Sequence, residues 1–411
     1  MGGFIDFMNR YVIPPLAKIG EEKHLRGIRN GIMLTVPFTI AGSIFLIISS
    51  LPLPNWDKIM ENYNAMLSVP INVTFGVLSV IAAIGMGFNL AKEYGQDTIM
   101  GALMSLVGFF LLQVNTDYTL NLDRFGSVGL FTALLVSIFC IEVQKYFVKR
   151  NLVIKLPENV PPAIANSFVG LIPLIFIIVV LWIIRVVLNF DITEFINMLF
   201  RPIVFALNTL PGILVYVFFI CLLWTVGIHG DSVMSAVGMP IFMQYLTENA
   251  QAFMAGKPIP YITASGFIDL FINIGGTGAT LALVFLMLKS KDEGLRTLGK
   301  VALPSGIFEI NEPVTFGFPI VFNPLMMIPY ILTPLVLTVG TYVLMALNII
   351  GKPVASVPWT MPAIIGPYLI TGGDWKAGVW SAIEIIIAAA IYYPFFKATE
   401  RERLKELEQK K

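Results

Sequence analysis

The chain has 411 residues, of which 56% are hydrophobic and only 13% are charged, and its formal net charge is +1. Ordinary soluble domains carry about 25% charged residues, so this composition excludes a soluble globular protein. It indicates an integral membrane protein, because many stretches approach the roughly 20 apolar residues that a membrane-spanning helix needs. The sequence lacks the alternation of a transmembrane β-barrel. The lipid bilayer is therefore the first predicted partner. The sequence has no basic aromatic surface that would suggest a nucleic-acid partner.

Hydropathy predicts an all-α integral membrane protein with about ten transmembrane helices. An amphipathic helix at about Asp191–Leu207 separates the first five spans from the last five. Two further apolar segments, near Glu312 and Trp359, contain prolines that interrupt helices, and we expect re-entrant or broken elements there. The predicted spans are Gly31–Ser50, Val69–Ala91, Thr98–Val114, Val128–Gln144, Ala163–Val187, Ile213–Thr225, Val233–Leu246, Phe267–Leu288, Pro324–Leu347 and Gly378–Phe395.

The distribution of polar residues predicts two functional halves. The first five spans carry few polar side chains at depth, whereas nearly every candidate site residue follows Leu210. We therefore expect a scaffold half and a transport half joined by the amphipathic helix. The predicted boundaries are residues 1–190 for the scaffold half, 191–210 for the linker, 211–396 for the transport half and 397–411 for a cytoplasmic tail.

Positive charge predicts the orientation in the membrane. With a cytoplasmic N-terminus, most lysines and arginines fall on the cytoplasmic side, as the positive-inside rule requires. Both termini are therefore predicted to face the cytoplasm. This orientation depends on the short span Val233–Leu246, because its loss would place Lys289–Lys300 outside. Seven of the 27 basic residues lie elsewhere: Lys58, Arg124, Arg185, Arg201, Lys257, Lys352 and Lys376.

The segment of residues 306–320 is unusually polar for its apolar surroundings. It contains Glu309, Asn311, Glu312 and Pro313. Carboxylates within a membrane are costly, and they commonly mark functional sites. Two adjacent carboxylates would not both ionise cheaply, so we expect one to face a pocket and the other to be paired or near the interface. The Asn311 amide suits a polyhydroxylated ligand, because it offers both donors and an acceptor. A purely structural role in capping broken backbone is the alternative.

A second polar cluster surrounds one of the two histidines. His229 follows an apolar span, together with Trp224 and Asp231, whereas His24 lies in a charged segment that predicts a solvated role. An imidazole can donate to or accept from a hydroxyl group. Trp224 and Trp359 are candidates for stacking on the apolar face of a sugar ring, next to the polar groups that bind its hydroxyls. A satisfied structural histidine is the alternative.

Other features leave more than one interpretation open. Asp269 and Glu384 lie in apolar spans, where a structural pairing is as plausible as a role in transport. The glycine-rich residues 273–278 follow no strand and lack the lysine of a phosphate loop, so they favour close helix packing over nucleotide binding. No cofactor and no metal site is predicted. The main alternative function is an ion-coupled sugar symporter, and a membrane-embedded transferase is a second one.

The motifs resemble those of a known family, the enzyme IIC permeases of bacterial sugar phosphotransferase systems, in the branch that takes lactose, cellobiose and N,N'-diacetylchitobiose. The similarity extends from Arg26 to the last span and so covers essentially the whole chain. The matching segments, in order, are Gly227-Ile228-His229-Gly230, Asn273-Ile274-Gly275-Gly276-Thr277-Gly278-Ala279-Thr280, Ile310-Asn311-Glu312-Pro313 with Gly317, Pro319, Asn323 and Pro324, and Pro358-Trp359-Thr360.

The resemblance implies a function. Such permeases are homodimers in the bacterial cytoplasmic membrane, with the N-terminal half at the dimer contact. They bind a disaccharide, move it by a rigid-body shift of the sugar-binding half, and present it for phosphorylation by a phosphocysteine on a separate enzyme IIB, which enzyme IIA phosphorylates. His229 and Glu312 match the family's key polar pair, whereas Glu309 occupies a position that often differs among members. The predicted substrate-binding residues are Trp224, Asp231, Asn273, Asn311 and Trp359.

Overall fold

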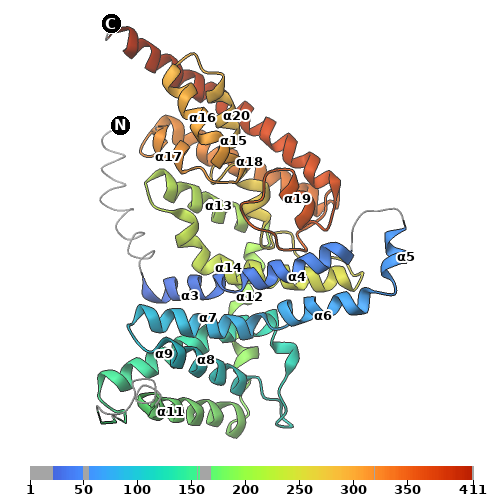
Figure 1. Ribbon diagram of the computed structural model, residues 1–411, viewed down its shortest axis with the longest axis vertical. Coiled ribbons are helices and arrows are strands. Elements are labelled where there is room, and N and C mark those ends of the chain that lie inside the picture. Colours follow the sequence, from blue (N-terminus) through green and yellow to red (C-terminus); the bar gives the residue numbers. More distant parts are fainter. Residues whose placement is uncertain (1–21, 50–54, 155, 158–167, 319, 410–411) are drawn as a thin grey trace.

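A computed structural model describes residues 22–49, 55–154, 156–157, 168–318 and 320–409. These residues form helices joined by turns and loops (Figure 1). No strand occurs among them, and only Val114 and Leu120 form an isolated bridge. The predicted all-α class is therefore confirmed. Two predicted span ends, at Ser50 and Ala163, lie outside the described residues, as does Pro319 of the polar segment.

The N-terminal helices form one packed group, drawn in blue to green in Figure 1. Helix α7 contacts α3, α8 and α9. Glycines allow these helices to approach closely: a Cβ atom on Gly87 would lie 2.5 Å from the carbonyl oxygen of Gly101. The helices are α3 (Lys23–Met33), α4 (Val36–Ser49), α5 (Trp56–Met60), α6 (Asn64–Phe75), α7 (Leu78–Glu93), α8 (Thr98–Leu112), α9 (Leu130–Lys149) and α11 (Leu171–Trp182).

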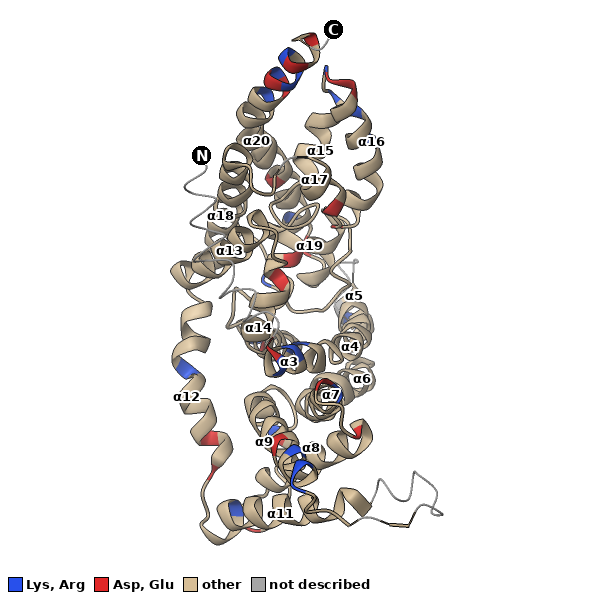
Figure 2. Cartoon of the chain, turned by 90° about the vertical axis from the view of Figure 1, so that its left-hand side faces the viewer, with Lys and Arg blue, Asp and Glu red and all other residues tan. Residues whose placement is uncertain are grey.

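The predicted linker helix is present as α12 (Ile192–Leu207). The helical residues Leu171–Val187 before it include a π-helical end, and the chain then bends by 87° into α12. Asp191 caps α12, because its side chain accepts a hydrogen bond from the backbone N–H of Glu194. Figure 2 shows α12 running along the side of the N-terminal group toward the later helices. The chain thus passes between its two parts along this helix.

The remaining helices form the second group, in yellow-green to red in Figure 1. Helix α18 contacts both α13 and α20, and α15 contacts α16 and α20. The elements are α13 (Leu210–Thr225), α14 (Gly230–Met254), the π-helix η5 (Ile268–Ile272), α15 (Leu281–Leu288), α16 (Glu293–Ile307), α17 (Glu312–Gly317), α18 (Pro324–Ala346), α19 (Ile365–Ile370) and α20 (Trp375–Gln409).

The predicted spans fit this architecture only in part. Within the described residues, five helical stretches are long and apolar enough to cross a membrane, or six with the bent pair that ends in α12. The predicted span Phe267–Leu288 is not one continuous helix, because the chain leaves the helix after Ile272 and re-enters one only at Leu281. The predicted span Val233–Leu246 lies within α14, which is 25 residues long but is not one of those stretches. The total of ten spans stays a prediction.

The expected broken elements are confirmed. Glu312 begins a helix of only six residues. Trp359 lies in the largely non-helical stretch between α18 and α19. In the predicted tail, residues 397–409 continue α20, and Glu400 among them is buried. Beside the first break, Glu309 and Asn311 are buried, whereas Glu312 and Trp359 are exposed.

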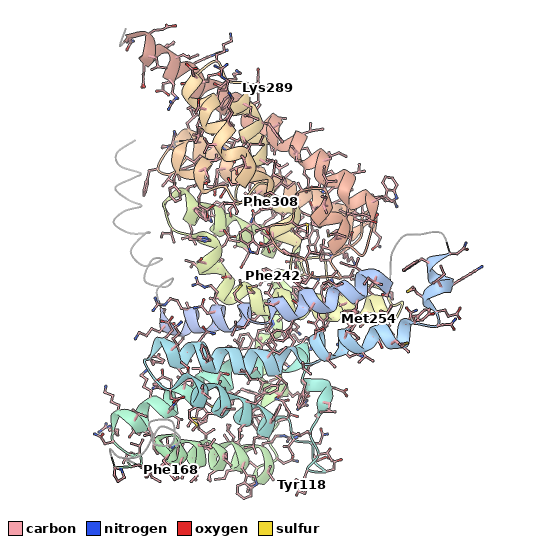
Figure 3. All side chains as sticks on the ribbon, viewed as in Figure 1. Tyr118, Phe168, Phe242, Met254, Lys289 and Phe308 are labelled. Carbon is pink, nitrogen blue, oxygen red and sulfur yellow. The ribbon has the colours of Figure 1, made fainter. Side chains whose placement is uncertain are left out.

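Helix α14 lies between the two groups of helices. It contacts α3 in the N-terminal group and α13 in the second. Figure 3 shows Phe242 of α14 in this intermediate position. Its ring packs edge-on against Tyr216 of α13, with ring centroids 5.1 Å apart. A second link crosses between the groups where the backbone N–H of Ser356 donates to Ser43 Oγ of α4 at 2.6 Å.

Candidate functional site

The turn between α13 and α14 positions His229. Gly227 has a φ of +80°, a value that glycine adopts without strain, and this conformation turns the chain from one helix into the next. His229 is the N-cap of α14, and its Nδ1 accepts a hydrogen bond from the backbone N–H of Ser232 at 3.2 Å. With Nδ1 as the acceptor, the neutral imidazole carries its proton on Nε2. The exposed ring can therefore donate one hydrogen bond to a ligand.

Trp224 and Asp231 join His229 in one cluster. The indole ring of Trp224 lies against the imidazole, with centroids 4.4 Å apart and planes at 45°. Its Nε1 donates to Asp231 Oδ2 at 2.8 Å. Trp224 is buried, so this bond also satisfies a polar group that water does not reach. The structure thus brings these three side chains into contact through Trp224.

A glycine-rich loop reaches the same carboxylate. This segment, residues 273–280, follows the π-helix η5 and is called the glycine loop below. Three of its glycines have positive φ values of +78°, +94° and +92°. At its centre, Thr277 Oγ1 donates to Asp231 Oδ2 at 2.8 Å. The loop is therefore tied to the polar cluster, in addition to the packing role expected from its small residues.

The glycine loop also contacts the turn before α17. Asn311 Nδ2 donates to the carbonyl oxygen of Thr277 at 2.6 Å. Glu309 accepts hydrogen bonds from the backbone N–H groups of Gly275 and Gly276, the latter at 3.2 Å. Glu309 itself has a φ of +66°, which turns the chain between α16 and α17. Both Glu309 and Asn311 are buried.

The two glutamates of this turn have different environments, as expected. Glu309 is buried and paired with the glycine loop. Glu312 is exposed at the start of α17, and its carboxylate has no hydrogen-bond or ion-pair partner among the described residues. A carboxylate in this state is free to accept a proton or a hydrogen bond from a ligand.

Four further residues singled out in the sequence make no described side-chain hydrogen bond or ring contact with Trp224, His229 or Asp231. Asn273 begins the glycine loop and is buried, and no described residue hydrogen-bonds to its side chain. Trp359 is 52% exposed, so its ring is available to a ligand, but it makes no ring contact with the other described aromatic residues. Glu384 is fully buried, and its carboxylate accepts from Thr341 Oγ1, which favours the structural interpretation. Asp269 is exposed, and it lies close enough to Asp231 and Glu309 for their charges to interact.

Thr277 is the residue that sequence reasoning missed. It joins Asp231 through its hydroxyl and Asn311 through its carbonyl oxygen. Its place in a loop bounded by glycines was the available signal, since such loops bring backbone groups close to ligands and other segments. Tyr392 was also missed: its hydroxyl donates to the carbonyl oxygen of Gly278 at 2.7 Å and anchors the far end of the loop.

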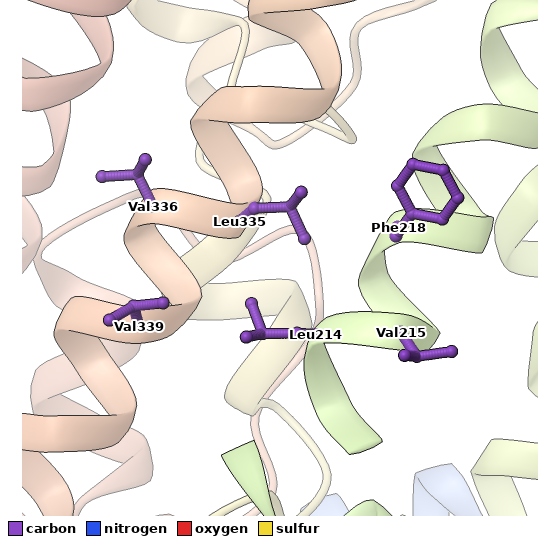
Figure 4. Close-up of a pocket in the computed structure, with 6 residues that line it drawn as sticks. All are labelled: Leu214, Val215, Phe218, Leu335, Val336 and Val339. Atoms are coloured by element: carbon purple, nitrogen blue, oxygen red, sulfur yellow. The ribbon is translucent and has the colours of Figure 1, made fainter. Parts of the chain in front are cut away.

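An apolar groove lies elsewhere, between α13 and α18 (Figure 4). It has a volume of about 390 Å³ and is lined by Leu214, Val215, Phe218, Leu335, Val336 and Val339. These side chains offer no hydrogen-bond partner to a hydroxyl group. The groove is therefore unsuited to a sugar. The described residues also contain no group of three or more His, Cys, Asp or Glu side chains that could hold a metal ion.

The fold and the polar cluster define a class: an all-helical membrane protein with polar residues gathered at helix breaks in its C-terminal part. Comparison with known proteins narrows this class. The chain is 37% identical over 421 residues to the lichenan permease IIC component of Bacillus subtilis (strain 168), covering 96% of this chain and 93% of that protein. It is 36% identical over 434 residues to the cellobiose-specific EIIC component of Geobacillus stearothermophilus, covering 99% and 96%.

Structural comparison gives the same result. The crystal structure of the transporter ChbC, the IIC component of the N,N'-diacetylchitobiose-specific phosphotransferase system, matches with a TM-score of 0.93 and 36% identity. The match covers 98% of this chain and 99% of that one. Residues 29–334 match the family described as "Phosphotransferase system, EIIC". The chain belongs to this family, as the resemblance of its motifs predicted.

Proposed function

We propose that this chain is a permease that binds a neutral β-linked disaccharide, of the cellobiose or diacetylchitobiose type, and moves it inward. At the cytoplasmic side it presents the 6-hydroxyl group of the sugar to phosphorylated enzyme IIB. The names of its relatives support this substrate class, because they contain lichenan, cellobiose and N,N'-diacetylchitobiose. No lysine or arginine of the described residues hydrogen-bonds to the side chains of Trp224, His229, Asp231 or Asn311, which favours a neutral sugar over an acidic one.

One observation carries the proposal: a continuous set of contacts joins His229 to the turn that bears Glu312. Trp224 links His229 to Asp231, and Thr277 links Asp231 to Asn311, the neighbour of Glu312. Groups that act on one substrate hydroxyl must be held at fixed spacing. The exposed indole of Trp359 is suited to an apolar face of a sugar, and amide or carboxylate groups are suited to its hydroxyls. Trp224 was also expected to stack on the sugar, but it is buried, so its part is to hold His229 and Asp231 in place.

The reaction needs little covalent help from this chain. In phosphoryl transfer, the phosphorus–sulfur bond of the enzyme IIB phosphocysteine breaks while a bond forms between phosphorus and the sugar oxygen. The hydroxyl proton then requires an acceptor, and the unpaired Glu312 carboxylate supplies one. His229 is suited to donate from Nε2, because Nδ1 is already occupied. That donor can hold the sugar hydroxyl or stabilise charge on the incoming phosphoryl group.

The test is uptake into liposomes that contain the purified chain, with cellobiose, diacetylchitobiose and lactose compared. We expect 6-phosphosugar inside the liposomes only when phosphorylated enzyme IIB is enclosed. Glu312→Gln should lower this product at least about 100-fold, the usual contribution of a general base. Glu402→Gln, at an exposed position on α20, is the matched control and should have no effect. Concentrative uptake of free sugar driven by an ion gradient, without enzyme IIB, would instead establish a symporter.

We also propose that residues 1–190 form the scaffold and the homodimer contact, and that residues 211–396 move as the sugar-binding half. Apart from the contacts of α14 and the bond between Ser356 and Ser43, the helices before α12 pack mainly on one another, as do the helices after it, and this supports the division. The mass of the purified protein, from light scattering corrected for detergent, distinguishes a dimer from a monomer. Crosslinks between engineered cysteines on the N-terminal helices of two copies should form, whereas equivalent pairs on α18 should not.

We propose further that both chain ends face the cytoplasm of a bacterial cell. Charged residues gather at the ends of α16 and α20, as Figure 2 shows, and this concentration supports the orientation. A cysteine introduced at exposed Glu408 should react with a membrane-impermeant maleimide only in inverted vesicles. Labelling in intact cells would contradict this orientation.

A further inference from the structure

Glu309 is a buried carboxylate to which no role is assigned above. Its Oε2 atom accepts hydrogen bonds from the backbone N–H groups of Gly275 and Gly276, which precede it by more than 30 residues in the chain. Positive φ angles at both glycines turn their N–H groups toward one point. Such paired N–H groups form a concave site for an anion, and here the chain's own side chain fills it.

The glycine loop held in this way carries the contacts of the proposed sugar site. Immediately after Gly276, Thr277 donates to Asp231 and accepts from Asn311. The fit is close, because a Cβ atom on Gly276 would lie 2.5 Å from Cγ of Asn311. A shift of the loop would therefore disturb both contacts at once.

We propose that Glu309 is a positioning residue for the sugar site, acting through the glycine loop. Its carboxylate fixes the loop, and the loop fixes the spacing between Asp231 and the turn that bears Glu312. This inference rests on the proposed function, since it concerns the same disaccharide site. It assigns Glu309 no contact with the sugar and no part in the proton transfer.

The contrast between the two glutamates supports this division of roles. Glu309 is 6% exposed and its carboxylate is bonded to backbone groups, whereas Glu312 is exposed and unpartnered among the described residues. Loss of this acceptor would leave the N–H groups of Gly275 and Gly276 without the partner that the structure gives them, and an unpaired buried N–H group is costly. One side chain is thus suited to hold the loop, and the other to meet the substrate.

The experiment measures cellobiose and diacetylchitobiose affinity of the purified full-length protein by titration calorimetry. Glu309→Ala should weaken binding about tenfold, the equivalent of one lost interaction of ordinary strength. Glu309→Gln should restore most of the affinity, because its amide oxygen can still accept from the two N–H groups. Glu309→Asp should behave like Glu309→Ala, because its side chain is one methylene too short to reach the two N–H groups. The aspartate variant takes the place of the alanine variant in the experiment if the latter does not fold.

A double-substitution cycle separates positioning from a general loss of stability. If Glu309 acts through the glycine loop, Glu309→Ala with Thr277→Val should bind about as weakly as the worse single variant. Wild-type affinity in a folded Glu309→Ala or Glu309→Asp protein, or multiplicative effects with Thr277→Val, would overturn this inference alone. Absence of disaccharide binding by the wild-type protein would overturn the proposed function as well.

Discussion

The Nδ1 atom of His229 accepts a hydrogen bond from the backbone N–H of Ser232, so the proposed catalytic imidazole also caps α14. The two roles use different ring atoms, because the ligand would meet Nε2. This relationship explains why the ring is fixed in orientation at an exposed position. It also means that the structural and chemical roles of His229 can be separated by substitution.

The first prediction compares His229→Asn with His229→Ala. Asparagine is a favourable N-cap, so His229→Asn should keep the free energy of unfolding within about 0.5 kcal/mol of the wild type. Alanine removes the cap and should cost about 1 kcal/mol. Both variants lack the Nε2 donor and should lose sugar phosphorylation by about 100-fold or more.

Thermal unfolding in detergent and the liposome assay measure these two quantities separately. If the sugar is phosphorylated at the wild-type level in liposomes that contain His229→Asn, the imidazole serves only as a cap. Loss of stability in His229→Asn equal to that in His229→Ala would show that the cap does not depend on the Nδ1 acceptor.

The second prediction concerns Trp224→Phe. Phenylalanine keeps an aromatic ring beside His229 but cannot donate to Asp231 as the indole does at 2.8 Å. Among the described side chains, Thr277 is then the remaining hydrogen-bond donor to the Asp231 carboxylate. We expect about tenfold weaker disaccharide binding by calorimetry. Trp182→Phe is the control, because that indole is 47% exposed on α11 and remote from the cluster in sequence. Equal losses of disaccharide affinity in the two variants would refute the prediction.

The apolar stretches made the fold class predictable, but not the internal break of Phe267–Leu288. Averaged hydropathy treats glycine as weakly apolar, so the segment resembles a single span. The break depends on positive φ angles at Gly275, Gly276 and Gly278, which become favourable only with the contacts around them. The span predicted within α14 shows a different limit. The helix is long enough to cross a membrane, but its mean hydropathy over that length is too low for it to count among the apolar helices.

The candidate site was predictable where side chains carry the signal. His229, Trp224 and Asp231 are close in sequence, and the structure joins them. The pairing of Glu309 was not predictable in detail, because its partners are backbone N–H groups 33 and 34 residues away, which leave no mark on side-chain identity. Thr277 was missed for a related reason, since one of its two contacts uses a carbonyl oxygen.

The third prediction is a pH dependence at Asp292, which lies between α15 and α16. Burial raises the pKa of its carboxyl group, but hydrogen bonds from Arg403 and from the backbone of Leu295 outweigh this effect and hold the pKa below its usual value. A lowered pKa in the folded state stabilises the protein at pH above about 4. This contribution is lost as the pH falls through the folded-state pKa.

Asp292→Asn should therefore lower the free energy of unfolding by about 1–2 kcal/mol at pH 7, since it removes the charge that Arg403 contacts at 3.0 Å. The difference from the wild type should vanish below about pH 3. Glu293→Gln is the control, because that side chain is 87% exposed and should change stability little. A difference that is the same at both pH values would contradict a charge-based contribution.

The fourth prediction concerns the hydrogen bond from the backbone N–H of Ser356 to Ser43 Oγ, which joins the two groups of helices at 2.6 Å. Both residues are buried, so Ser43→Ala leaves an N–H group without its partner and should cost about 1–3 kcal/mol of stability. Ser68→Ala is the matched control, because that hydroxyl donates only to Ala65 within α6. If the sugar-binding half moves against the N-terminal half, this bond must also break during transport, so Ser43→Ala should change the rate of sugar uptake while Ser68→Ala does not. An unchanged melting temperature and an unchanged uptake rate in Ser43→Ala would show that the contact contributes to neither.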